Sequence, residues 1–305
     1  MVYERTLANE ITATGIGLHS GKEVSLTLSP ADVGTGIVFE RADLDGARIP
    51  MSANLVQDTM MSSNLVQGDA RVGTVEHLLS AVAACGLDNL IIKVDAPEIP
   101  IMDGSAAPFL YLIHEAGIKE QNKAKQFIKI LKPVRVEVED GDKWAQFTPY
   151  DDGFLMDFEI DFNHEAIKST DQKTTLDFNT ANFAREVGQA RTFGFLKDLE
   201  YLRERNLALG GSLDNAVVLD DTSVMNEGGL RYPNEFVRHK MLDAVGDLFV
   251  IGHPILAHFS AYKSGHAVNN MLIRAVLADE SSYEIVNFCN RKDAPIEYLE
   301  PIIFV

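Results

Sequence analysis

The sequence has little cysteine and tryptophan, no long apolar run and a deficit of positive charge. Its 305 residues include 2 Cys and 1 Trp. Two thiols exclude a disulfide framework and a four-thiolate zinc site, and they fit a reducing cytoplasm. Lys and Arg number 27 against 45 Asp and Glu, so the formal net charge is −18. Such an excess of carboxylates disfavours non-specific binding to nucleic acid or to an anionic membrane surface.

No segment has the pattern of a membrane span or a signal peptide. No apolar run approaches the roughly 18 residues of a transmembrane helix, and the start, MVYERTLANEITATG, lacks basic and apolar signal regions. Hydrophobic residues make up 46% and charged residues 24% of the chain, which excludes a disordered protein. We therefore expect a cytoplasmic protein with no integral membrane segment and no nucleic-acid partner. We also expect a monomer, although composition and charge do not determine the oligomeric state.

The same order of predicted elements occurs twice. In each half, strands precede a histidine-bearing helix, a strand, a turn of small residues and a second helix. The first half comprises strands within residues 1–50, a helix at Thr74–Ala84 with Thr74 as N-cap, a strand at Asn89–Val94 and a helix that Gly117 ends. The second half comprises strands within residues 127–162, a helix at Phe236–Phe249, a strand at Leu256–Tyr262 and a helix through Met271–Leu277.

The polar segment Lys119–Lys125 lies between the two halves and marks the predicted boundary. We therefore predict an α+β fold with two similar domains, residues 1–122 and residues 123–305. A site that collects side chains from both halves would lie at the domain interface.

His239 and Asp243 are candidate metal ligands. They are four residues apart on a predicted helix and lie on one face, which Asp247 extends by another turn. A nitrogen and an oxygen ligand at this spacing form half of a zinc site. The same spacing also fits an amphipathic helix whose polar face carries these residues without a ligand.

Glu76 and His77 are adjacent on the histidine-bearing helix of the first half. Neighbouring helical residues point about 100° apart, so one can bind a metal while the other faces metal-bound water as a general base. A structural interpretation is also open, in which Glu76 caps the helix and His77 is a boundary residue.

His266 lies in a Ser-Gly-His turn between a predicted strand and a predicted helix. An imidazole with a pKa near neutrality suits proton delivery to a leaving group, although a turn histidine needs no function. His77, His239 and Asp243 together would give zinc three ligands and leave a position open for water, as in catalytic sites. The residues by themselves are consistent with a metal hydrolase and equally leave open a non-catalytic protein that a metal stabilises.

Seven long motifs occur in one order along the whole chain. They are TATGIGLHSG, TVEHLLSA, PIMDGSAAPF, ARTFGF, LALGGS, NEGGLRYPNEFVRHKMLDAVGDL and FSAYKSGHAVNN. With these motifs the sequence resembles the UDP-3-O-acyl-N-acetylglucosamine deacetylases of Gram-negative bacteria, which catalyse the committed step of lipid A synthesis. Another zinc amidohydrolase, such as a peptidase, is the alternative.

The resemblance implies a fold and a set of catalytic roles. The implied fold has two similar α+β domains of layered sheet and helices, with the helices sandwiched between the sheets. The implied roles are zinc ligation by His77, His239 and Asp243, general base catalysis by Glu76, a second acid/base role for His266, orientation of that imidazole by Asp247, and assistance at the oxyanion by the Thr192 hydroxyl.

The resemblance also implies contacts to a UDP-linked, acylated glucosamine substrate. Lys240 would lie beside the site, Lys263 and Lys143 near the nucleotide phosphates, and Asp161 and Phe162 near the uracil. An insert around residues 193–221 would form a hydrophobic passage for the acyl chain. Its apolar residues include Phe193, Leu196 and Leu199.

Overall fold

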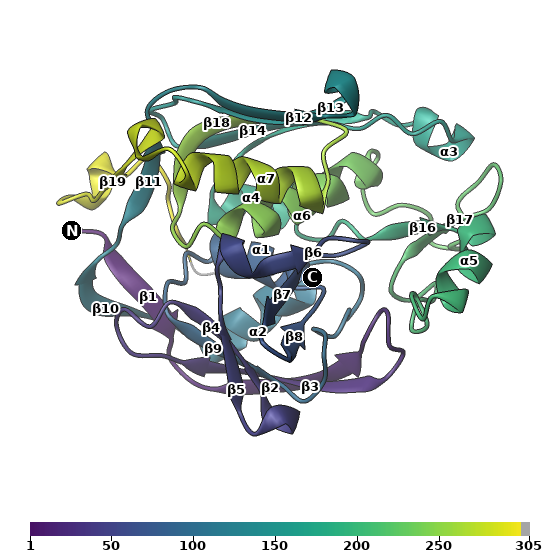
Figure 1. Cartoon of the computed structure of the whole chain (residues 1–305), viewed down its shortest axis with the longest axis horizontal. Helices are drawn as coiled ribbons and strands as arrows, with labels where there is room; N and C mark the ends of the chain where they lie inside the picture. Colours follow the sequence, from purple (N-terminus) through teal and green to yellow (C-terminus); the bar gives the residue numbers. More distant parts are fainter. Residues whose placement is uncertain (300–305) are drawn as a thin grey trace.

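The computed structural model describes residues 1–299, so residues 300–305 of the predicted second domain lie outside the described part. Helices occur together with mostly antiparallel sheets, which makes the fold α+β, as predicted (Figure 1). The helices are α1 (Glu76–Ala84), α2 (Ala107–Ala116), α3 (Glu165–Lys168), α4 (Thr180–Glu186), α5 (Leu199–Glu204), α6 (Glu235–Phe249) and α7 (His266–Leu277).

The first large sheet comes from the first hundred residues. Its strand order is β2 (Ile11–Ile16), β3 (Glu23–Pro30), β9 (Leu90–Val94), β4 (Ile37–Arg41) and β5 (Ala47–Pro50). The β4–β9 pair is parallel and the other pairs are antiparallel. The apolar residues of β3 alternate with polar ones and are buried, because one face of this sheet packs on the core. A separate small sheet contains β6 (Val56–Asp58), β7 (Asn64–Gln67) and β8 (Ala70–Val72).

The second large sheet repeats this arrangement. Five of its strands follow the order β12 (Val134–Val138), β13 (Lys143–Thr148), β18 (Ile255–Tyr262), β14 (Phe154–Glu159) and β15 (Lys173–Asp177). The β14–β18 pair is parallel and the other pairs in this series are antiparallel, as at the matching places of the first sheet. Strands β11 (Phe127–Ile130) and β19 (Tyr283–Val286) extend it. The two halves of the chain therefore share a strand topology.

The helices lie between the two large sheets. Figure 1 shows β12, β13, β14 and β18 on one side, β2, β3, β4, β5 and β9 on the other, and α1, α2, α4, α6 and α7 in the space between. A single continuous cluster of buried apolar residues draws on both sheets and on these helices. This is the layering that the resemblance implies, and it makes the centre of the molecule a place where both halves contribute side chains.

Helices α1 and α6 cross at very close range. A Cβ at Gly246 of α6 would lie 2.0 Å from the backbone oxygen of Glu76, the first residue of α1. Only glycine permits this approach, because any side chain at that position would collide with the backbone of α1. The close crossing brings the N-terminal turn of α1 against α6, and this contact determines where the candidate site forms.

The start of α1 differs from the prediction. Val75 precedes the helix and no side chain caps it, so the expected N-cap at Thr74 is wrong. Thr74 has a φ of 53°, and its buried hydroxyl has no hydrogen-bond partner within the described part of the chain. The backbone turns through the left-handed region at this residue, and its hydroxyl therefore makes no capping bond to the first turn of the helix.

The predicted boundary segment is part of a strand. Residues Ile118–Ala124 form β10, which pairs with β1 (Tyr3–Leu7) in an antiparallel ribbon. The polar residues of β10 are mostly exposed, so backbone pairing with β1 forms the strand despite a composition typical of a loop. The next residue, Lys125, is fully buried, and its Nζ lies 2.6 Å from Oδ2 of Asp88. The division of the chain into domains 1–122 and 123–305 stays a prediction.

The segment around residues 193–221 projects from the layered core. It contains β16 (Phe193–Phe195), the parallel partner β17 (Val217–Leu219) and the short helix α5. Its exposed apolar side chains are Leu196, Tyr201, Leu209 and Leu213. Figure 1 shows these elements at one end of the molecule, beyond the space between the sheets.

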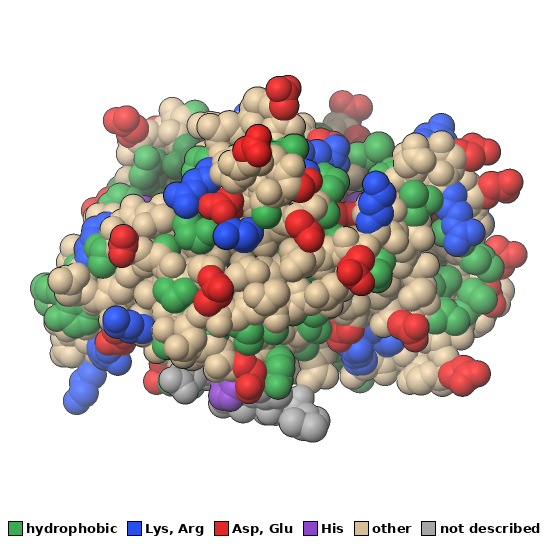
Figure 2. Space-filling model, turned by 90° about the horizontal axis from the view of Figure 1, so that it is seen from below, with side chains coloured by type: hydrophobic (Ala, Val, Ile, Leu, Met, Phe, Trp, Pro, Cys, Tyr) green, Lys and Arg blue, Asp and Glu red, His purple; other side chains and the backbone are tan. Residues whose placement is uncertain are grey.

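The surface carries mixed charges. Figure 2 shows acidic side chains spread over the face seen from below in Figure 1, with lysine and arginine interspersed among them. On the first large sheet, for example, Glu40 accepts from Arg48 at 3.0 Å and lies 3.3 Å from Lys93. Within the described residues, no helix combines the length and the apolar character that a membrane crossing requires.

Candidate active site

Helices α1 and α6 bring three potential metal ligands together. His77 lies on α1, and His239 and Asp243 lie one turn apart on α6. Nε2 of each histidine is 3.3 Å from Oδ1 of Asp243, and three potential ligand atoms lie within 4.8 Å of one another. All three side chains are buried. The structure thus assembles the three residues that the sequence suggested.

His239 is held in the form that binds a metal. Its Nδ1 lies 3.0 Å from the backbone oxygen of Ala190. A carbonyl oxygen can only accept, so Nδ1 carries the hydrogen and Nε2 keeps its lone pair. Burial lowers the pKa of His239 to about 3, although Asp243 acts in the opposite direction. The ring is therefore neutral at pH 7 and directs a free lone pair into the cluster.

Asp243 supplies a charged oxygen. Its Oδ2 accepts a hydrogen bond from Lys240 at 2.5 Å. Burial raises the pKa of Asp243, but His239 and Lys240 outweigh it and hold the pKa well below its usual range. Its Oδ1 and the Nδ1 of His77 are buried without hydrogen-bond partners among residues 1–299. Two imidazoles and one carboxylate with an unsatisfied buried oxygen fit a divalent metal ion.

Glu76 lies beside the three ligands and is buried. Its Oε2 accepts from the backbone N–H of Ser63 at 3.0 Å, and its Oε1 lies 3.9 Å from Nε2 of His266. Burial raises the pKa of Glu76 against the influence of His266 and His77. A carboxylate whose pKa is moved towards neutrality suits a general base better than an exposed one.

His266 is paired with Asp247. Its Nδ1 lies 2.9 Å from Oδ2 of Asp247. Burial lowers the pKa of His266, but Asp247 and Glu76 outweigh burial and raise it to about 9, so the imidazole is a cation at pH 7. His266 is the first residue of α7, after the extended Gly265, and α7 therefore begins earlier than the predicted Met271–Leu277 segment.

A cavity of about 370 Å³ gives access to these groups. Its polar lining includes Thr74, Glu76, His77, Thr192, His239, Lys240, Asp243 and His266. Its apolar lining includes Leu18, Met61, Phe162, Phe193, Phe195 and Leu202. The ring of Phe162 packs edge-on against Phe193 with centroids 5.5 Å apart. One cavity therefore combines the candidate metal ligands, a carboxylate, an imidazolium and an apolar wall.

Of the lysines predicted near the nucleotide, Lys143 is the first residue of β13 and Lys263 directly follows the last residue of β18. Nζ of Lys263 is 2.7 Å from Asp142 and 3.8 Å from Asp161. Nζ of Lys143, on the neighbouring strand, is 2.6 Å from Glu139. None of these residues lines the cavity described above. Their contacts to substrate stay predictions.

The two leucines predicted for the acyl passage lie beside a different hollow. Leu196 and Leu199 line a surface cavity of about 470 Å³ together with Glu200, Arg203 and Glu204. Leu202, one turn beyond Leu199 on α5, lines the cavity that contains the metal ligands. Residues of α5 thus line both cavities. The role of Leu196 and Leu199 in binding an acyl chain stays a prediction.

Sequence reasoning missed two partners of Asp247. The Ser63 hydroxyl donates to Oδ1 of Asp247 at 2.6 Å, and the amide of Asn269 donates to Oδ2 at 2.9 Å. Asn269 belongs to the motif FSAYKSGHAVNN, where its position one turn after His266 could have indicated it. Ser63 is distant in sequence and carries no comparable signal.

The fold and the site together define an α+β protein with a candidate metal-hydrolase centre between its two sheets. Residues 4–278 match the family model described as LpxC: UDP-3-O-acyl N-acetylglycosamine deacetylase. The chain belongs to this family. The protein named UDP-3-O-acyl-N-acetylglucosamine deacetylase from Psychrobacter cryohalolentis is 58% identical over 97% of this chain and 92% of its own length. The protein of the same name from Vibrio vulnificus is 55% identical over 99% of this chain and 98% of its own length.

Proposed function

We propose that this chain hydrolyses the N-acetyl group of UDP-3-O-acyl-N-acetylglucosamine, releasing acetate and the free amine in the committed step of lipid A synthesis. The observation that carries the proposal is the buried cluster of His77, His239 and Asp243, with Glu76 and His266 in the same cavity. Family membership and the printed names of the relatives supply the substrate. We also propose that the protein acts in the cytoplasm as a monomer.

The cluster would hold zinc through His77, His239 and Asp243, because two imidazoles and one carboxylate are a common ligand set of catalytic zinc. A zinc ion bound there would supply an acidified water and polarise the acetamide carbonyl. Lys240 donates to the second oxygen of Asp243, which leaves the other oxygen directed at the two histidines. This arrangement orients the ligands before a metal arrives.

The remaining polar residues would handle protons and developing charge. Glu76 would take the proton of the attacking water, as its raised pKa favours. The His266 cation and the Thr192 hydroxyl would stabilise the acetamide oxygen as negative charge develops on it. His266 or Glu76 would then protonate the leaving amine. Asp247 would keep His266 charged and aimed.

The pH dependence tests the pairing of His266 with Asp247. A pKa of about 9 keeps His266 protonated through neutral pH, so activity that needs the cation is lost only as the pH rises through about 9. The ion pair of His266 with Asp247 also contributes to the free energy of unfolding. Its contribution is complete below the pKa of ~6.5 that His266 has in the unfolded chain, and it is lost as the pH rises towards and through about 9. In Asp247→Asn the alkaline limb of kcat/KM should move to lower pH, with a loss of about 10–100-fold at pH 8. An alkaline limb at the same pH in both proteins would contradict the role of Asp247.

The apolar wall tests where the acyl chain lies. Leu202→Asp should raise KM for a long-acyl substrate by about tenfold or more. The charged side chain should prevent burial of about two methylenes of the acyl chain, and each buried methylene contributes ~0.8 kcal/mol to binding. Leu199→Asp, on the same helix but beside the other hollow, should raise KM by a smaller factor. Neither change should matter for a substrate without the acyl chain. Equal losses on both substrates would mean that α5 supports the fold instead of binding the chain.

One experiment tests the function as a whole. The purified protein should contain one zinc per chain by elemental analysis, and it should release acetate from the UDP-linked substrate at a rate that depends on this metal. Hydrolysis of a peptide or a simple amide, followed by the amine that it releases, in place of the UDP-linked substrate would favour another zinc amidohydrolase. A bound metal without any hydrolysis would indicate a metal-stabilised binding protein.

A further inference from the structure

The segment of residues 190–192 lies beside the candidate metal ligands. The oxygen of Ala190 accepts from Nδ1 of His239 at 3.0 Å, and Thr192, two residues later, lines the cavity. The N–H of Thr192 donates to Gly104 at 2.8 Å, and its oxygen accepts from Val217 at 2.8 Å. A candidate metal ligand and the predicted oxyanion donor therefore depend on the position of the same short segment.

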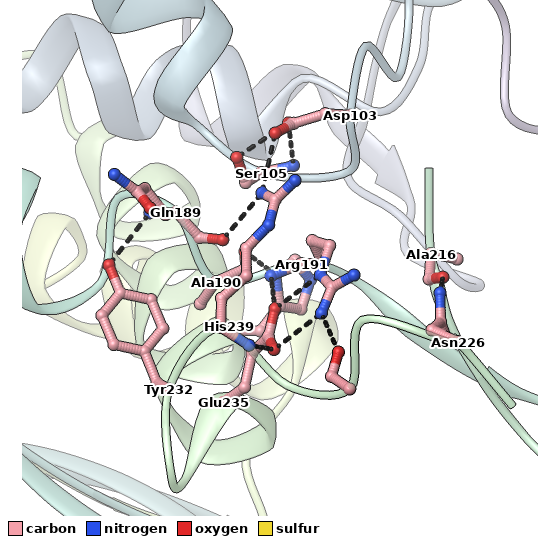
Figure 3. A network of polar contacts seen from close by, with 12 residues as sticks. Asp103, Ser105, Gln189, Ala190, Arg191, Ala216, Asn226, Tyr232, Glu235 and His239 are labelled. Atoms are coloured by element: carbon pink, nitrogen blue, oxygen red, sulfur yellow. Dashed lines mark hydrogen bonds and ion pairs between the residues drawn. The ribbon is translucent and has the colours of Figure 1, made fainter. Parts of the chain in front are cut away.

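A buried ion pair holds this segment against α6. Nε of Arg191 lies 2.8 Å from Oε1 of Glu235 and its Nη2 lies 3.1 Å from Oε2, so the pairing is bidentate. The backbone N–H of Arg191 donates to the same carboxylate at 2.9 Å. The Glu235 side chain is fully buried and that of Arg191 is 10% exposed. Glu235 precedes His239 by one turn of α6, so the helix that carries the ligand also holds the segment whose carbonyl orients it (Figure 3).

A second contact anchors the same segment to the first half of the chain. Nη1 of Arg231 donates to Oδ2 of Asp103 at 2.7 Å and to the backbone oxygen of Gln189 at 3.1 Å. The backbone N–H of Arg231 donates to Glu235 at 2.6 Å. Figure 3 shows Asp103 and Ser105 on one side of the segment and Glu235 and His239 on the other. The Glu235 carboxylate thus accepts hydrogen bonds from both Arg191 and Arg231.

We propose that Arg191 and Glu235 are positioning residues for the metal centre: their ion pair holds the Ala190 carbonyl on His239 and sets the place of Thr192. The pair touches neither the cavity nor the ligand nitrogens of the cluster, so it acts through the backbone between them. Loss of either partner leaves the other charge buried and unpaired. The segment would then shift, and Nδ1 of His239 would lose the acceptor that fixes its tautomer and ring orientation. This inference rests on the proposed metal site.

The test compares conservative variants of the pair with two controls. Arg191→Lys keeps the charge but loses the bidentate fork, and Glu235→Gln keeps the shape but loses the charge. Arg185→Lys is the matched surface control, because Arg185 pairs with Glu186 at 2.8 Å while 58% exposed. Leu28→Ala, in the buried face of β3, is a control for lost stability alone. Each full-length protein is loaded with zinc, and zinc release to a chromogenic chelator is followed together with thermal unfolding, kcat and KM.

We expect Arg191→Lys and Glu235→Gln each to release zinc about 10–100-fold faster than the parent chain, with a lower kcat and a nearly unchanged KM. The two controls should keep the parent release rate, although Leu28→Ala unfolds at a lower temperature. Release at the parent rate from whichever pair variant folds would overturn the inference and leave the pair a purely structural role. If the parent chain itself binds no zinc, the proposed metal site is wrong. That result differs from normal zinc binding with parent release rates in the pair variants, which would contradict only the positioning role of the ion pair.

Discussion

Glu76→Ala is expected to lower kcat by about 10²–10⁴-fold while zinc content stays the same, since that is the usual contribution of a general base. The carboxylate of Glu76 is buried beside the candidate metal ligands, but it accepts a hydrogen bond from the Ser63 N–H and faces His266 instead of joining the three candidate ligands. Its burial raises its pKa, which places the group nearer the pH at which it must exchange a proton. The measurement is kcat from acetate release, with metal analysis of the same sample.

Two comparisons make this result specific. Glu76→Gln keeps the size of the side chain and its acceptor for the Ser63 N–H, so it should lose activity to a similar degree with little loss of stability. Glu4, also buried, pairs with Lys123 at 2.8 Å in the β1 ribbon, so Glu4→Gln should leave kcat near the parent value. Loss of zinc from Glu76→Ala would show that this carboxylate is a ligand, and the roles assigned to Glu76 and Asp243 would have to be revised.

His239→Ala is expected to lose its zinc during purification and its acetate-releasing activity with it. Removal of this imidazole leaves only His77 and Asp243 from the cluster, and zinc sites need at least three protein ligands. The loss of affinity should exceed the roughly 10–100-fold effect of a residue that only supports a ligand. Elemental analysis and activity after addition of excess zinc are the measurements.

The control for this prediction is His114→Ala. His114 lies in the last turn of α2 and is exposed, so its removal should change neither metal content nor activity. Metal content that remains at one per chain in His239→Ala would contradict the assignment of the cluster. Activity without metal in that variant would contradict the proposed chemistry itself.

Helix α6 of the site was predictable because its signals are local. The spacing of His239 and Asp243 places both on one face of α6, which the structure has at Glu235–Phe249 against a predicted Phe236–Phe249. The predicted Asn89–Val94 and Leu256–Tyr262 strands correspond to β9 and β18 within one residue. Apolar periodicity determines such elements, since each buries one face against the core.

The errors lie where distant contacts, or an unusual backbone conformation, outweigh local preference. Residues 119–124 read as a polar link, but β1 offers them a pairing partner and they form β10. Thr74 has the side chain of an N-cap, but a left-handed backbone at this residue prevents capping. The Ser63 hydroxyl bonds to Asp247, 184 positions along the chain. No spacing within the sequence encodes a contact of that range.

The sequence by itself determined the donor groups of the site and their local order. His239 precedes Asp243 by one helical turn, Glu76 precedes His77, and both statements follow from helix geometry alone. Only the tertiary structure decided that these groups meet. Gly246 lets α6 approach the backbone of Glu76 closely. The Arg191–Glu235 ion pair holds the segment whose Ala190 carbonyl accepts a hydrogen bond from His239. The close helix approach and the ion pair both depend on burial in a core that the two halves share, because close packing and low solvent access make such contacts specific. A short stretch of sequence does not determine which distant residues will be packed against it.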